Sequence, residues 1–196
     1  MGMAIRICVF CGSSCGVRPE YVAAAVALGR HLAGRGIAIV YGGGRVGLMG
    51  ALADAALEAG GEVIGVMPRC LVDKDVGHRR LADLRVVDSM HQRKALMAEL
   101  SGAFIALPGG FGTFEEFCEV LTWTQLGLQR KPCGILNVEG YYDALLALFD
   151  HAAAEGFLKP VHRQMVLSAT GPEALVDRLL SCQTPAVDKW IGLKPA

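Results

Sequence analysis

The sequence predicts an α/β fold in which a parallel, Rossmann-like sheet carries helices on both faces. Short apolar runs alternate along the chain with longer segments of helical periodicity, which is the pattern of repeated strand–helix units. Turns of glycine and other small residues directly follow three of the apolar runs. The 196 residues contain no linker, internal repeat or low-complexity segment, so we expect a single domain over residues 1–182 and a loose tail over residues 183–196.

The first half of the chain predicts four strands and three helices. Strands are expected over residues 5–10, 37–41, 63–67 and 84–87, and helices over residues 19–35, 47–59 and 89–100. Pro19 suits a first helical turn, because the N–H group that proline lacks has no partner there. Gly60 and Gly61 end the second helix, and Pro68 ends the third strand.

The second half continues the alternation. Strands are expected over residues 104–107 and 132–138, and helices over residues 114–126, 141–155 and 173–181. Strands this short and apolar, separated by helices, are typical of a parallel sheet that is buried on both faces. In such sheets ligands bind outside the carboxyl ends of the strands.

Three small-residue turns leave the carboxyl ends of predicted strands, at residues 11–14, 42–44 and 108–113. Glycine lets backbone N–H groups approach an anion closely, and a helix N-terminus adds partial positive charge. A single glycine turn is more often only a tight turn, and the P-loop pattern is absent. Their repetition at three strand ends favours one crevice that binds a phosphate.

A basic pair, Arg93 and Lys94, stands near the start of the helix predicted over residues 89–100. Positive charge at a helix N-terminus opposes the helix dipole. We therefore expect these side chains to meet an anion or a carboxylate, and the alternative is a solvated surface pair.

Glu115 and Glu116 follow the third turn and are expected in the first turn of the next helix. Acidic residues there are ordinary stabilisers of a helix, and one of the two can be only that. A carboxylate beside a bound phosphate can also reach the attached sugar. Glu119, one turn further on, is expected to be structural.

Charge and cysteine content exclude several classes of function. Lysine plus arginine and aspartate plus glutamate both total 19, so nothing indicates nucleic acid or an anionic membrane as a partner. No apolar run has the ~18 residues of a membrane span, and no signal peptide is recognised. Cys8 and Cys11 form the only C-x-x-C among seven cysteines. This motif could belong to a metal site or a redox pair, or its cysteines could be buried and reduced in a cytoplasmic protein. We favour the buried, reduced cysteines.

Taken together, these segments resemble the LONELY GUY family of nucleoside 5′-monophosphate phosphoribohydrolases. The family motif P-G-G-x-G-T-x-x-E matches residues 108–116 at every fixed position, and M-H-x-R-K is present at residues 90–94. The turns at residues 11–14 and 41–44 also look like those of the family. The resemblance covers roughly residues 5–180.

The resemblance implies that Arg93 and Glu116 are the catalytic pair. It also implies a set of residues that contact the nucleotide: Gly12, Ser13, Gly43, Gly44, Asp75, Lys94, Gly109, Gly110, Gly112, Thr113 and Thr122. Lys94 is expected near the phosphate. Asp75 stands where many members have a glutamate, which puts a shorter carboxylate at that contact.

The implied activity is hydrolysis of the N-glycosidic bond of a nucleoside 5′-monophosphate, which releases a free base and ribose 5-phosphate. The base is adenine or an N6-prenylated adenine, and neither a cofactor nor a metal is expected. A homodimer is also implied. Five apolar residues of the predicted helices lie either in the dimer interface or in the protein core: Leu96, Met97, Leu100, Trp123 and Leu126.

Other functions compete with this one. A non-enzymatic carrier of a nucleotide-like cofactor such as molybdopterin shares the fold, but it does not need both Arg93 and Glu116. A glycosidase for pyrimidine monophosphates is disfavoured because related enzymes are longer. Family members are often labelled lysine decarboxylases, but that reaction needs a pyridoxal cofactor held by a lysine. Lys94 is the only lysine near the predicted site, and it lies beside Arg93 in an anion-binding context.

Overall fold

The computed structural model describes residues 5–74 and 76–182, which form one seven-stranded sheet with the order β4-β3-β2-β1-β5-β6-β7. Every strand pair is parallel. The strands are β1 (Arg6–Phe10), β2 (Ala38–Tyr41), β3 (Val63–Pro68), β4 (Asp83–Val87), β5 (Ala103–Ala106), β6 (Cys133–Leu136) and β7 (Val166–Ala169). The predicted Rossmann-like α/β class is confirmed.

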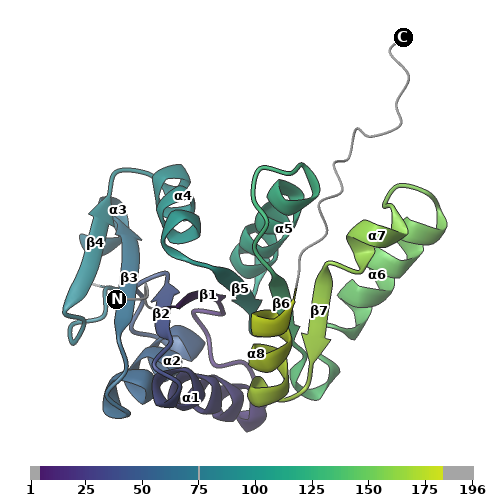
Figure 1. Cartoon of the computed structure of the whole chain (residues 1–196). Coiled ribbons are helices and arrows are strands. Elements are labelled where there is room, and N and C mark those ends of the chain that lie inside the picture. Colours follow the sequence, from purple (N-terminus) through teal and green to yellow (C-terminus); the bar gives the residue numbers. More distant parts are fainter. Residues whose placement is uncertain (1–4, 75, 183–196) are drawn as a thin grey trace.

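Helices cover both faces of the sheet, as predicted. They are α1 (Pro19–Gly34), α2 (Gly47–Glu58), α3 (Arg69–Val72), α4 (Met90–Leu100), α5 (Phe111–Gln125), the 3-10 turn η1 (Val138–Gly140), α6 (Asp143–Ala154), α7 (Pro160–Arg163) and α8 (Pro172–Ser181). Figure 1 shows α1, α2 and α8 on one face and α4, α5 and α6 on the other.

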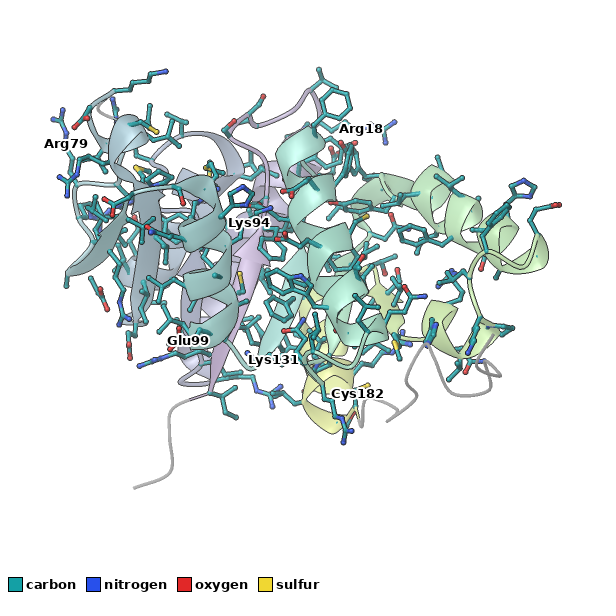
Figure 2. The ribbon with its side chains drawn as sticks, turned by 90° about the horizontal axis from the view of Figure 1, so that it is seen from above. Arg18, Arg79, Lys94, Glu99, Lys131 and Cys182 are labelled. Atoms are coloured by element: carbon teal, nitrogen blue, oxygen red, sulfur yellow. The ribbon has the colours of Figure 1, made fainter. Side chains whose placement is uncertain are left out.

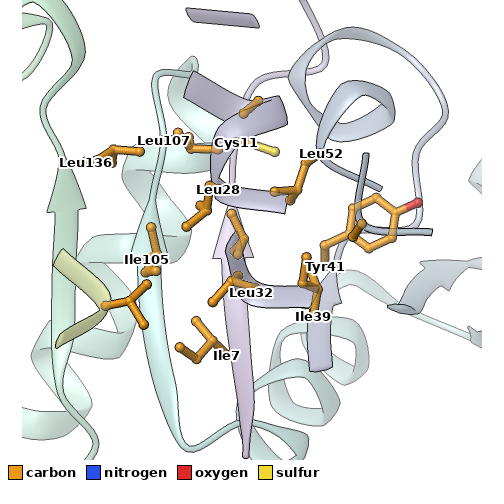
Figure 3. Close-up of a cluster of buried hydrophobic side chains, with 14 of the residues drawn as sticks. Ile7, Cys11, Leu28, Leu32, Ile39, Tyr41, Leu52, Ile105, Leu107 and Leu136 are labelled. Atoms are coloured by element: carbon orange, nitrogen blue, oxygen red, sulfur yellow. The ribbon is translucent and has the colours of Figure 1, made fainter. Parts of the chain in front are cut away.

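The core consists of two apolar clusters, one on each face, because successive strand side chains point in opposite directions. Ile7 and Val9 of β1 join the cluster under α1, α2 and α8, part of which is drawn in Figure 3. Cys8 and Phe10 join the cluster under α4 and α5. Strands β1, β2 and β5 are therefore buried on both sides, which explains their nearly continuous apolar sequence.

The order of the strands reverses between β1 and β5. From β1 the chain first extends the sheet through β2, β3 and β4, and then returns across it to add β5, β6 and β7 on the other side of β1. The loops that leave β1 and β5 consequently diverge and open a crevice between them. This switch point is where two of the three small-residue turns lie.

Four short elements were not predicted: α3, η1, α7 and β7. Each has only three or four residues, too few to show a helical or an alternating apolar pattern, and β7 (VLSA) is buried only at its first residue. Strand β7 completes the edge of the sheet next to β6.

The predicted start of the helix after the glycine turn is wrong by three residues. Helix α5 begins at Phe111 instead of Phe114, so Gly112 and Thr113 belong to its first turn. Two glycines around the start hide the helical pattern, since glycine is the least helix-favouring residue apart from proline. Glu115 and Glu116 therefore lie in the second turn of α5, and the first turn contains no acidic residue.

The C-x-x-C cysteines do not form a pair. Cys8 belongs to the apolar cluster on one face of the sheet and Cys11 to the cluster on the other. All seven cysteines are free thiols, and burial raises the pKa of both Cys8 and Cys11. A redox role for this motif is thus excluded in favour of two buried thiols.

Two expectations fall outside the described residues: Asp75 and the tail over residues 183–196. Within the described ranges, no cluster of three or more histidine, cysteine or acidic side chains has the arrangement of a metal site. No helix there is long and apolar enough to cross a membrane.

Candidate active site

A crevice of about 320 Å³ opens at the carboxyl ends of β1 and β5. Its walls come from the first and third small-residue turns, with Tyr21 and Tyr141 at one side. The lining residues are Gly12, Ser13, Ser14, Cys15, Gly16, Tyr21, Leu48, Pro108, Gly109, Gly110 and Tyr141. Four predicted ligand residues are thereby brought together: Gly12, Ser13, Gly109 and Gly110.

Backbone hydrogen bonds fix the first turn in place. The N–H of Gly12 donates to the carbonyl of Pro108 at 3.0 Å. The carbonyl of Gly12 accepts from the N–H groups of Leu48 and Met49, at 3.1 and 3.3 Å, in the first turn of α2. A Cβ on Gly12 would lie 3.3 Å from the Cα of Gly109, so the two turns approach each other at glycines.

The N-terminus of α5 lies at the other wall of the crevice. Its N-cap residue, Gly110, has no side chain with which to accept from the first N–H groups of the helix. Thr113 is buried against Gly109, where an added Cβ would meet the Thr113 Oγ1 atom at 2.1 Å. Gly110 and Gly112 are exposed, and an added Cβ would meet nothing within 4 Å at either. These uncapped N–H groups can therefore receive an anion.

Two tyrosines, which sequence reasoning missed, support the third turn from outside. The Tyr142 hydroxyl donates to the carbonyl of Leu107 at 2.6 Å, and the Tyr141 hydroxyl donates to the carbonyl of Gly109 at 2.5 Å. The carbonyl groups of Leu107 and Gly109 thus point toward the two tyrosines. The pair follows β6, far from the turn in sequence, and no local pattern could have indicated this contact.

Arg93 and Glu116 form a buried ion pair, with an Nη1–Oε1 distance of 2.9 Å. Arg93, on α4, is 9% exposed, and Glu116, on α5, is 8% exposed. The Arg93 Nε atom also donates to the carbonyl of Val66 in β3, at 3.1 Å. The two residues that the family resemblance singles out are therefore in direct contact, and their ion pair joins α4 to α5.

The second small-residue turn supports this arginine instead of lining the crevice. An ideal Cβ on Gly42 would lie 1.9 Å from the Arg93 Nη2 atom, so the guanidinium occupies the space that a side chain would need. Gly43 packs under Leu84 and Met67 with a φ of +77°, and Gly44 packs against Met49. The expectation that all three turns line one crevice is thus wrong for Gly43 and Gly44, because Arg93 and apolar side chains fill that space.

Lys94 meets carboxylates, as its place in the helix predicted. Its Nζ atom lies 2.5 Å from Glu115 Oε1 and 3.0 Å from Glu119 Oε1, and Figure 2 shows it between α4 and α5. Burial alone would lower the pKa of Lys94, but the hydrogen bonds to Glu115 and Glu119 outweigh it and raise the pKa. The alternative of a solvated surface pair is excluded for both basic residues.

The carboxyl group of Glu116 titrates above its ordinary range. Burial raises its pKa, and the nearby Arg93 offsets this only in part, so the net shift is upward. The charges of Glu116 and Arg93 also act on Cys11, the residue before Gly12. The ion pair therefore lies behind the strand end whose turn lines the crevice.

Thr122 is not brought to this crevice. It lies exposed on α5 and lines a separate, mainly apolar pocket of about 280 Å³ with Leu121, Phe149 and Phe157. Its hydroxyl donates to the carbonyl of Cys118 at 2.8 Å.

Of the five apolar residues considered for an interface, Met97 belongs to the core and the other four are half-buried in the single chain. Met97 is 1% exposed, and Leu96, Leu100 and Trp123 pack half-buried against the cluster under α4 and α5. Leu126 is half-buried as well.

The sheet, its switch-point crevice and the buried Arg93–Glu116 pair define a Rossmann-like α/β protein with a crevice lined by two glycine turns. A protein-family model described as "Possible lysine decarboxylase" matches residues 49–179. Plant relatives then identify the branch: the chain belongs to the LONELY GUY family of cytokinin riboside 5′-monophosphate phosphoribohydrolases.

The relatives are similar over most of the chain. One is the probable cytokinin riboside 5′-monophosphate phosphoribohydrolase LOGL9 of Oryza sativa subsp. japonica, 53% identical over 89% of this chain and 77% of its own length. Another is the cytokinin riboside 5′-monophosphate phosphoribohydrolase LOG7 of Arabidopsis thaliana, 51% identical over 89% of this chain and 80% of its own.

Solved structures confirm the fold. A molybdenum cofactor binding protein from Rippkaea orientalis superposes with a TM-score of 0.71 at 23% identity, covering 92% of this chain and 98% of that one. The molybdenum cofactor carrier protein of Chlamydomonas reinhardtii gives 0.69 at 22% identity, with 91% and 99% covered. At this identity the likeness concerns the fold alone.

Proposed function

We propose that this protein hydrolyses the N-glycosidic bond of adenosine 5′-monophosphates, with or without an N6-prenyl group, to the free base and ribose 5-phosphate. The observation that carries the proposal is the buried Arg93–Glu116 pair beside a crevice lined by two glycine turns. Relatives about half identical to this chain are named for the same reaction on cytokinin riboside 5′-monophosphates.

The backbone would bind the 5′-phosphate. The turn after β1 and the uncapped N-terminus of α5 face each other across the crevice. Their N–H groups and the Ser13 hydroxyl offer hydrogen bonds to phosphate oxygens, and the dipole of α5 favours negative charge there. Lys94 would add a positive charge at longer range, because Glu115 and Glu119 already hold its ammonium group.

Glu116 would act on the ribose. Cleavage of an N-glycosidic bond passes through an oxocarbenium-like transition state that carries positive charge on the sugar. An ionised Glu116 stabilises that charge or orients the attacking water. Arg93 holds the Oε1 atom of Glu116, and the Oε2 atom would serve the sugar hydroxyls. Arg93 would thus position the carboxylate and favour its ionised form, against the larger effect of burial.

A decarboxylase reaction does not suit this site. A pyridoxal-dependent lysine must lose its proton to form a Schiff base, which requires a lowered pKa. The pKa of Lys94 is raised by its two carboxylate partners. The phosphoribohydrolase reaction needs no such amine.

The assembly we propose is a homodimer in the cytoplasm, as the family resemblance implies. Several large apolar side chains are exposed in the single chain, and an assembly would cover them: Phe111, Leu128, Leu148 and Phe157. Thr122 faces the same side as Phe157, so we place its role at or near a subunit boundary.

The decisive experiment measures release of free base from AMP and from isopentenyladenosine 5′-monophosphate. We expect turnover by the wild type and a loss of about 10²–10³-fold in Glu116→Gln, since one electrostatic group at a transition state has that effect. Glu99→Gln is the matched control, because this glutamate is exposed at the far end of α4.

Adenosine serves as the second comparison. Because the phosphate provides most of the binding contacts, adenosine should be a poor substrate. Full turnover by folded Glu116→Gln would contradict the assignment of Glu116. Tight nucleotide binding without base release by the wild type would favour a carrier.

A further inference from the structure

A buried histidine, His78, lies outside the crevice and next to the Gly42–Gly44 turn that contacts Arg93. His78 is 5% exposed and lies in the segment that connects α3 to β4. Neither the family motifs nor the crevice includes it. A buried imidazole normally has polar partners for both ring nitrogens, and those partners show which parts of the chain the side chain connects.

The two ring nitrogens have different partners. The Nδ1 atom accepts from the backbone N–H of Arg80 at 3.3 Å. The Nε2 atom lies 3.3 Å from Asp54 Oδ1 on α2. An Nδ1 atom that accepts a hydrogen bond carries no proton, so the proton is on Nε2, the nitrogen that lies next to the Asp54 carboxylate. The side chain therefore joins its own segment to α2.

The backbone of the same segment holds the second small-residue turn. The N–H of His78 donates to the carbonyl of Gly43 at 2.9 Å, and the N–H of Arg45 donates to the carbonyl of Val76 at 3.1 Å. Gly44 and Gly77 form an isolated antiparallel bridge between these hydrogen bonds. The Gly42–Gly44 turn is thus joined to the segment before β4 by backbone hydrogen bonds on either side of this bridge.

This turn is the surface on which the Arg93 guanidinium rests, since the Nη2 atom occupies the place of a Cβ on Gly42. A shift of the turn would move Arg93 and, with it, the hydrogen-bonded Glu116. Misplacement of a reacting group by about 1 Å can cost about 10²-fold in rate. Helix α2 also holds the Gly12 carbonyl at the crevice, so one helix supports both parts of the site.

We infer that His78 is a positioning residue: through the contact of its ring with Asp54 and the backbone hydrogen bond to Gly43 it holds the Gly42–Gly44 turn, and thereby the Arg93–Glu116 pair, in the geometry that acts on the nucleotide. This inference rests on the proposed function. His78 itself does not touch the reacting atoms.

The test compares three substitutions of His78. Glutamine places an amide N–H donor near the position of Nε2 and can still reach Asp54, whereas asparagine has the same amide at the position of Nδ1 and falls short. We expect kcat for AMP to fall about 10-fold or more in His78→Ala and His78→Asn, and to recover substantially in His78→Gln. Asp54→Ala should match His78→Ala, and the double variant should be no worse than either alone.

Arg80→Ala is the control. It removes the exposed Arg80–Asp54 ion pair at 2.7 Å but keeps the backbone N–H that donates to His78, so kcat and KM should stay at the wild-type values. The melting temperature is measured for every variant. A structural role alone would lower it without changing kcat of the folded protein, and that result would overturn the inference.

The affinity for AMP, measured by calorimetry, separates this inference from the proposed function. If the wild type releases no base, the proposed reaction fails, and the His78 series is then judged on AMP affinity. Weaker binding in His78→Ala and His78→Asn that is restored in His78→Gln would still support the positioning role. Equal affinity across the series would overturn it.

Discussion

At the scale of single residues, the role proposed for Glu116 depends on the charge of its carboxyl group. Its pKa is raised because burial opposes ionisation more strongly than Arg93 favours it. We expect the acid limb of kcat/KM to lie above the ordinary glutamate value of 4.5, with activity lost as pH falls through it, since the ionised form is the active one. A pH profile with AMP checks this, and an acid limb at or below 4.5 would contradict it.

The sequence predicted both members of the buried ion pair and four of the residues that line the crevice: Gly12, Ser13, Gly109 and Gly110. Arg93 and Glu116 stand in recognisable motifs, and the misfit of basic residues at a helix start correctly indicated carboxylate partners. Tyr141, Tyr142 and His78 escaped prediction because their partners are distant backbone carbonyls and Asp54. Such contacts depend on how loops pack and leave no periodic pattern in the sequence.

At the scale of elements, the join between β5 and α5 depends on Gly109. A Cβ there would lie 2.1 Å from the Thr113 Oγ1 atom and 2.9 Å from the Gly12 N atom, so the turn must open. We expect Gly109→Ala to reduce base release at least 10-fold, because both walls of the crevice would shift. Gly34→Ala, at the end of α1 where a Cβ meets nothing within 4 Å, is the matched control.

The measurement is turnover of AMP together with the melting temperature of both variants. Wild-type turnover by Gly109→Ala would show that the close approach of the two turns is dispensable.

Helices and strands were predictable from the sequence where a long periodic pattern of apolar residues existed, as in α1 and α2. The start of α5 was not predictable, because Gly110 and Gly112 lower the helix propensity of the sequence there.

At the scale of the whole molecule, the exposed apolar side chains predict self-association. A chain of 20.8 kDa should give a mass of about twice that value in light scattering at micromolar concentration, as the proposed homodimer requires. The exposed positions lie on several elements, including 92% exposed Phe111 and 88% exposed Phe157. A mass near 20.8 kDa that does not change with concentration would contradict the dimer.

The strand order has one more consequence. Everything up to α4 builds β1 to β4 and carries Arg93, whereas everything from β5 onward builds the rest of the sheet and carries Glu116. Exposed Gly102 lies between these two parts. A chain cleaved at that point would yield two fragments, each with half of the ion pair and one wall of the crevice. Neither fragment alone could catalyse the reaction. Recovered turnover after the two fragments are mixed would show that they had reassembled by pairing β1 with β5.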